Sequence, residues 1–90
     1  MPKFVIERDF ADVGKLSEDE LKTISRTARD VIMAPGTEVQ WLYSFVTENK
    51  TYCVYIAPDE EILRTRSEAA GFPITRISRV TSTIDPTTAE

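Results

Sequence analysis

Few side chains in this sequence could do chemistry, and histidine is absent altogether. Without imidazole the chain has no histidine general base, no Ser-His or Cys-His nucleophile pair and no imidazole metal site. Cys53 is the single thiol and falls in the middle of a predicted strand, which favours a small buried hydrophobic role. A reactive thiol would need a nearby cation, which Arg66 or Arg76 could supply.

Two runs of acidic residues, 18–20 and 59–61, have the composition of a cation site or an acid–base pair. Each run, however, opens a predicted helix, where the helix dipole and the free amides favour negative charge. Ser17 and Glu20 have the spacing of a capping box, and Asp59 is placed to cap the second helix. We therefore interpret both runs as helix caps.

The best candidate for a functional surface is a set of aromatic residues with one arginine. The aromatic side chains could stack on bases or line a pocket or a dimer interface, and Arg66 could reach the rim. The other arginines are expected to form a solvated, salt-bridged surface. The predicted site, a ligand pocket or an interface, consists of Trp41, Tyr43, Phe45, Tyr55 and Arg66.

The length and the net charge of the chain limit the number of its domains and the classes of ligand that such a site could bind. A chain of 90 residues predicts one domain, residues 1–90, with the last few able to form a loose tail. A net charge of −4 argues against a general nucleic-acid binder and against adhesion to anionic lipid. The lone cysteine, together with an N-terminus that does not read as a signal peptide, predicts a cytoplasmic protein.

The elements that would position these residues alternate between strand and helix patterns. Strands are expected at 3–8 and 74–84, the second with a bulge or a bend, and a hairpin at 39–56. Helices are expected from residue 18 to Pro35-Gly36 and from Asp59 to a left-handed cap at Gly71. This order predicts an α+β, ferredoxin-like βαββαβ fold. Its four-stranded antiparallel sheet has the strand order 4-1-3-2, with both helices on one face.

The hairpin allows two registers. With Glu48-Asn49 as a two-residue loop, Phe45 pairs with Tyr52; with a three-residue loop, Phe45 faces Cys53 and Tyr43 faces Tyr55. We prefer the second, which gives the helices an aliphatic face and leaves an aromatic face open.

In either register each sheet face carries apolar side chains, and two helices can cover only one of them. Monomers rarely expose a large contiguous apolar patch. We therefore predict a homodimer whose open sheet faces pack together or enclose a pocket.

Several short strings of the sequence together resemble a family of small domains of unknown function. The members of this family are similar in fold to ferredoxin-like dimers, and one of them is a nickel-binding, nickel-responsive protein. The matching strings are 2–8, Gln40-Trp41, 52–58, 71–73 and 84–90. The resemblance implies nickel as a cofactor. Family members commonly carry histidine where Tyr43 stands and often another near Arg66, and both are missing here, so nickel binding is not expected to carry over.

These observations predict a non-catalytic cytoplasmic homodimer that binds itself and a small molecule, but no nucleic acid, membrane, cofactor or metal. Two alternatives stay open. One is a divalent-metal protein with altered ligands, and the other is a cofactor-independent enzyme of the dimeric α/β-barrel kind, an analogy of fold alone. A cavity beside Tyr43 and Tyr55 with a polar group of shifted pKa would favour the enzyme.

Overall fold

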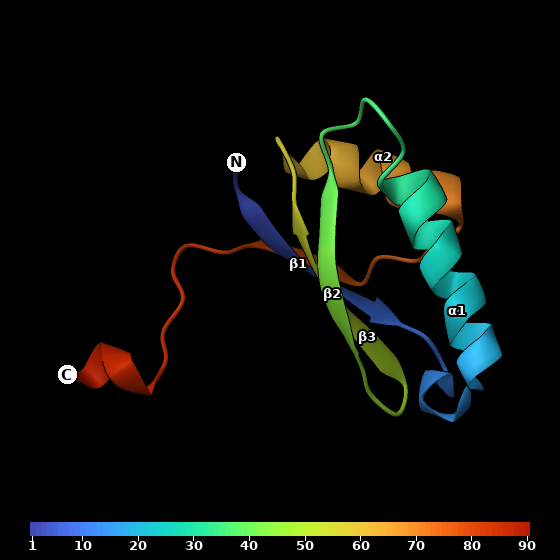
Figure 1. Cartoon of the computed structure of the whole chain (residues 1–90), viewed down its shortest axis with the longest axis horizontal. Helices are drawn as coiled ribbons and strands as arrows, with labels where there is room; N and C mark the ends of the chain where they lie inside the picture. Colours follow the sequence, from blue (N-terminus) through green and yellow to red (C-terminus); the bar gives the residue numbers. More distant parts are fainter.

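A computed structural model covers residues 1–90 and has the predicted α+β, ferredoxin-like architecture. Its sheet has the order β2-β3-β1-β4, which is the predicted 4-1-3-2. Both long helices lie on one side of the sheet (Figure 1). The main elements are β1 (Lys3–Asp9), α1 (Glu18–Thr27), β2 (Gln40–Val46), β3 (Lys50–Ile56), α2 (Glu60–Ala70) and β4 (Arg76–Arg79), with short helices η1 (Val13–Lys15), η2 (Ala28–Ile32) and η3 (Pro86–Ala89).

The helix ends follow the predicted local chemistry. Ser17 and Glu20 form a full capping box, with both side-chain-to-amide bonds at 3.1 Å. Asp59 accepts from the amide of Ile62, and Gly71 ends α2 at a φ of 76°, in the left-handed region. The acidic runs are therefore caps, as predicted. No helix combines the length and the apolarity that a membrane crossing requires.

The first helix departs from prediction in its last part, where η2 continues it as a π-helix instead of a regular α-helix. The carbonyl of Val31 lies in the last turn of this segment, where helix carbonyls have no partner within the helix, and it accepts two bonds from Arg66 on α2, at 3.0 and 2.6 Å. The π-helical segment therefore joins the two helices of the layer through a side chain.

The core lies between the sheet and the two helices. Phe4, Ile6 and Tyr55 come from the central strands, Ile32 from η2 and Leu63 from α2, and each is at most 4% exposed. Burial of these side chains supplies the main stabilising free energy and fixes which sheet face the helices cover.

Our preferred hairpin register is wrong. Phe45 pairs with Tyr52, as the two-residue loop requires, but a bulge between Trp41 and Tyr43 shifts the far end so that Trp41 pairs with Tyr55. A bulge adds one residue to one strand and reverses the faces beyond it. Trp41 and Tyr55 therefore face the helices, whereas Tyr43 and Phe45 face the open side.

The last strand is shorter than predicted: β4 spans only Arg76–Arg79, whereas the expected strand covered 74–84. The bulge or bend expected in this strand does not interrupt the pairing of β4 with β1, and the register shift of the sheet lies in β2. Beyond Val80 the chain leaves the body as an extended arm that ends in η3 (Figure 1). Ile84 in this arm is 78% exposed.

Candidate ligand cavity

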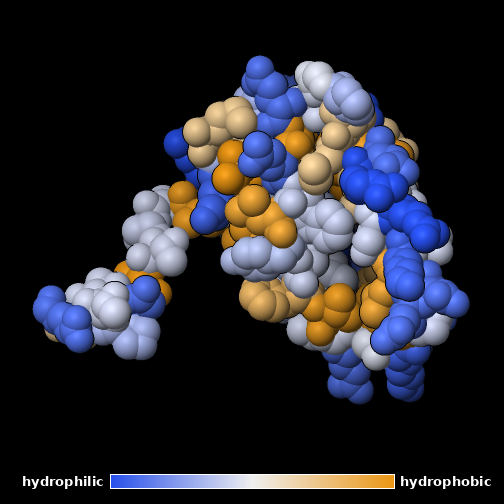
Figure 2. Space-filling model, in the orientation of Figure 1, coloured by the Kyte–Doolittle hydropathy of each residue, from blue (hydrophilic) through white to orange (hydrophobic).

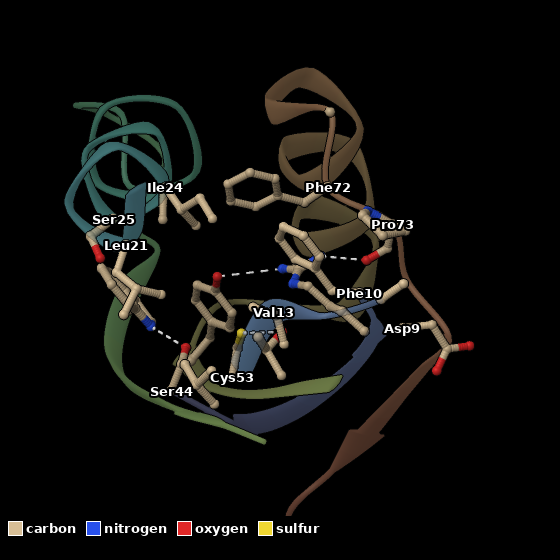
Figure 3. A pocket seen from close by; sticks show the side chains of 18 residues that line it. Asp9, Phe10, Val13, Leu21, Ile24, Ser25, Ser44, Cys53, Phe72 and Pro73 are labelled. Atoms are coloured by element: carbon tan, nitrogen blue, oxygen red, sulfur yellow. Dashed lines mark hydrogen bonds between the residues drawn. The ribbon is translucent and has the colours of Figure 1, made fainter. Parts of the chain in front are cut away.

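A cavity of about 610 Å³ lies on the helix-covered side of the sheet, between α1 and the segment that follows α2. Of its 18 lining residues 11 are hydrophobic, so the walls favour an apolar occupant. Leu21 and Ile24 of α1 face Phe72 across the opening, and Val13 lies deeper (Figure 3). The volume falls within the range of pockets that hold small organic ligands.

Arg8 lines this mostly apolar cavity with a charged side chain and is only 3% exposed. Its guanidinium donates to the carbonyl of Pro73 at 2.9 Å and, weakly, to the Tyr55 hydroxyl at 3.4 Å (Figure 3). It also donates to Ser67 Oγ at 3.1 Å. The ring of Phe72 lies 5.5 Å from the guanidinium carbon. Arg8 is thus held in place by four neighbours, none of which is an anion.

The charge of Arg8 has no counter-ion in the structure. No carboxylate lies within ion-pair distance, and Arg8 Nε is buried without any hydrogen-bond partner. Buried charges in proteins are normally paired, and a buried donor left unmatched costs about 1–3 kcal/mol. Asp9 also borders the cavity, but its carboxylate points away from it (Figure 3) and pairs with Lys50.

Tyr55 supplies a second polar group beside Arg8. Burial raises the pKa of its hydroxyl to about 12, so the phenol is neutral at physiological pH and cannot serve as the anion for Arg8. The hydroxyl oxygen accepts from Arg8, which leaves its own proton free to donate. Arg8 and Tyr55 therefore present N–H and O–H donors together, inside apolar walls.

The structure does not bring the five predicted site residues together. Trp41 and Tyr55 border the cavity, and Trp41 Nε1 donates to Ser44 Oγ at 2.9 Å. Tyr43 and Phe45 lie on the opposite, open face as an edge-to-face pair with ring centroids 5.4 Å apart. Arg66 does not reach the cavity rim, because its guanidinium binds the Val31 carbonyl.

Sequence reasoning missed Arg8, although the sequence carried a signal. Phe4, Ile6 and Arg8 alternate along β1 and all face the helices, so a charge stands at an inward position of a central strand. A charged residue on the buried face of a strand is uncommon enough to mark a candidate site.

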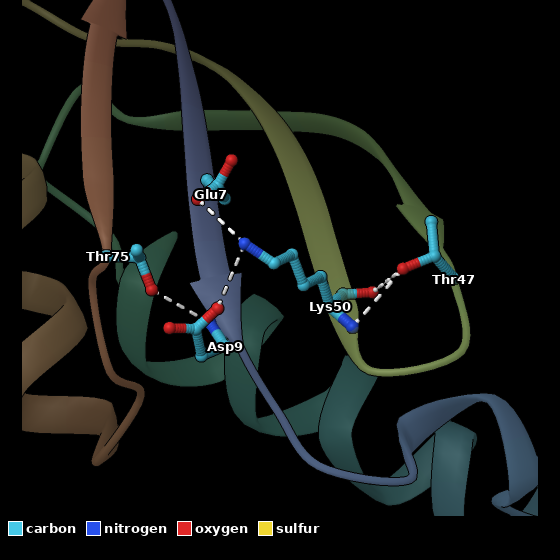
Figure 4. Close-up of polar contacts among 5 residues, drawn as sticks. All are labelled: Glu7, Asp9, Thr47, Lys50 and Thr75. Atoms are coloured by element: carbon cyan, nitrogen blue, oxygen red, sulfur yellow. Dashed lines mark hydrogen bonds and ion pairs between the residues drawn. The ribbon is translucent and has the colours of Figure 1, made fainter.

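The open face has an aromatic part and a charged end. Lys50 Nζ lies 3.2 Å from both Glu7 and Asp9 (Figure 4). Hydrogen bonds from Lys50 to these carboxylates raise its pKa, Glu7 having the larger effect. Lys50 thus occupies the position between two carboxylates that a bound cation would take.

The residues do not fit a nickel site. No three side chains among histidine, cysteine, aspartate and glutamate come together where they could hold a metal ion. Cys53 is buried beside Thr51, and Tyr43 lies on the opposite, open face and offers only a phenol, which is a poor ligand.

Comparison with known proteins gave one family and one informative structure. The family described as "Nickel responsive protein SCO4226-like" matches residues 4–80. The crystal structure of SCO4226 from Streptomyces coelicolor A3(2) is similar, with a TM-score of 0.77 and 17% identity over 91% of this chain and 99% of that chain. At that identity the likeness concerns the fold. No curated protein sequence matches the chain.

Proposed function

This chain belongs to the SCO4226-like family of nickel-responsive proteins, and we propose that it is a non-catalytic homodimer that binds a small molecule with a largely apolar body in the cavity beside Trp41 and Tyr55. The observation that carries the proposal is the cavity of about 610 Å³ with mostly hydrophobic walls. The sequence placed a pocket on the open sheet face, whereas this cavity lies on the helix-covered face.

We do not extend the nickel response in the family's name to this chain. Nickel prefers imidazole, and this sequence offers neither histidine nor a cluster of three alternative ligands. Family membership therefore supports the fold of this chain. The chemistry of its ligand has to be inferred from the residues that line the cavity.

A binding role fits the chemistry of the cavity better than catalysis does. A general acid or base works best with a pKa near the operating pH, whereas burial moves the pKa of Tyr55 away from neutrality, to about 12. Arg8 cannot accept a proton, and Cys53 is buried. The cavity has groups that orient a ligand and lacks a group that would exchange protons with it at neutral pH.

Trp41 fluorescence provides the test, because Trp41 is the single tryptophan and borders the cavity. Nile red, a neutral apolar dye, should become fluorescent with the protein and quench Trp41. Ile24→Phe fills the opening and should weaken binding at least tenfold. Thr23→Phe adds the same ring on the exposed side of α1 and should leave binding unchanged. Equal titrations for the wild type and Ile24→Phe would contradict the proposal.

The homodimer is supported by the open face and the arm. Tyr43 is 51% and Phe45 59% exposed, and the arm carries Ile84 away from its own body. Hydrophobic residues reach the surface over the sheet, away from the hydrophilic outer side of α1 (Figure 2). A second copy could cover this face and receive the arm, which would remove the apolar surface of both from water.

Light scattering at micromolar concentration tests the dimer. Tyr43→Ala should weaken dimerisation by at least about tenfold, since exposed aromatic residues supply much of an interface's binding energy. Val46→Ala is the matched control, because Val46 lies on the same strand, is 46% exposed and faces the other side. A monomeric wild type would refute the dimer, and equal effects of the two substitutions would refute the open face as its interface.

A further inference from the structure

We infer that the ligand of this cavity is a monoanion, an organic carboxylate with an apolar body, whose carboxylate is recognised by Arg8 and Tyr55. This inference rests on the proposed binding function and goes beyond it by assigning the charge and the head group of the ligand. The observation behind it is the buried guanidinium that borders an apolar cavity and lacks a counter-ion.

The hydrogen-bond count of Arg8 leaves room for such a head group. A guanidinium has five N–H donors, and its three recorded bonds go to Pro73, Ser67 and Tyr55, so two donors have no protein acceptor. One of them is on Nε, which is shielded from solvent. The Tyr55 hydroxyl accepts from Arg8 and carries a proton of its own, so a carboxylate could accept from both residues.

The surroundings define the charge of the ligand. Arg8 contributes one positive charge, the Tyr55 phenol is neutral, and the Asp9 carboxylate is engaged with Lys50 outside the cavity. A carboxylate would neutralise the buried charge, whereas a phosphate dianion would leave one negative charge uncompensated in an apolar environment. A neutral ligand would leave the guanidinium charge unpaired.

The walls define the rest of the ligand. Val13, Leu21, Ile24 and Phe72 surround the space next to the two polar groups, so an alkyl chain or an aryl ring is the complementary body. Medium-chain fatty acids and arylalkanoates combine such a body with a single carboxylate. The cavity thus combines one pair of polar anchoring residues with walls that are mostly apolar, which is the usual composition of a small-molecule site.

The test compares decanoate with decanol on the full-length wild type at neutral pH, with Trp41 fluorescence and calorimetry as the two measurements. The two molecules share an alkyl chain and differ in the charged head group. Decanoate should bind at least tenfold more tightly than decanol, because charge-assisted hydrogen bonds are about twice as strong as neutral ones. Inorganic phosphate should displace neither.

Arg8→Met should abolish the preference for decanoate, while Arg64→Met, which removes an exposed arginine paired with Glu60, should keep it. If Arg8→Met does not fold, the comparison on the wild type decides alone. Equal affinity for the two ligands, or tighter binding of decanol, would overturn the carboxylate assignment and leave the proposed function standing. If decanoate, decanol and Nile red all fail to bind, both the assignment and the binding function are wrong.

Discussion

The buried phenol of Tyr55 makes the stability of this protein depend on alkaline pH in a predictable way. Burial raises its pKa from 10.0 to about 12 in the folded state. The native protein therefore holds the phenolic proton more tightly than the unfolded chain does. The contribution is fully present below pH 10 and is lost as the pH rises from about 10 to 12. Stability must fall, not rise, across this range.

The size of the loss follows from the two pKa values. At pH 11 the unfolded chain would be mostly ionised at this position while the folded protein would be mostly neutral, which costs about 1.4 kcal/mol of unfolding free energy relative to pH 9. Tyr55→Phe removes the titrating group, so wild type should lose about 1.4 kcal/mol more than the variant over this interval. At neutral pH the variant should be less stable by about 0.5–1.5 kcal/mol, since the bond from Arg8 is lost.

Urea unfolding followed by circular dichroism at pH 9 and pH 11 measures both effects. Tyr43→Phe is the matched control, because Tyr43 is half exposed and that variant should follow wild type. Equal losses in wild type and Tyr55→Phe would refute the reasoning, because the phenol would then have the same pKa in the folded and unfolded protein and would not be shielded from water as the structure has it.

Three further substitutions test how the elements are held together, each measured by urea unfolding. Arg66→Met should cost about 1–2 kcal/mol through the two lost bonds to Val31 and should leave Nile red binding unchanged, since Arg66 is not at the cavity. Gly14→Ala should cost about 1–3 kcal/mol, because a Cβ there would lie 2.9 Å from the Thr47 carbonyl oxygen, part of a backbone that cannot easily move. Ser17→Ala should cost about 1 kcal/mol by removing the cap of α1, and Ser17→Asp should restore most of it. An Arg66→Met variant that lost Nile red binding, or a Gly14→Ala variant as stable as wild type, would contradict the packing described here.

The elements of this fold were predictable because each follows from local chemistry. Ser17 and Asp59 are helix N-cap residues, and Gly71 is a helix C-cap residue. The order of strand and helix patterns along the chain is compatible with few topologies. The hairpin loop was predictable only as a choice between two registers. Local sequence could not decide between them, because both place apolar residues on both faces.

The bulge in β2 shows why the candidate site could not be assembled from the sequence. Trp41 and Ser44 are three residues apart, so in a regular strand they would point to opposite faces. The extra residue at the bulge brings both to the helix-covered face, where Trp41 Nε1 bonds Ser44 Oγ at 2.9 Å. This arrangement depends on packing against α1, which no pattern within the strand encodes.

The same bulge separates the two roles that the sequence assigned to one aromatic surface. It turns Trp41 inward to border the cavity, beside Tyr55 and near Arg8, and leaves Tyr43 and Phe45 outside on the open face. Ligand binding and dimerisation would then use opposite sides of the one sheet. Substitutions on either side should therefore affect one activity and spare the other, because residues without shared neighbours act independently. A Tyr43→Ala variant that loses Nile red binding would show instead that the dimer completes the cavity.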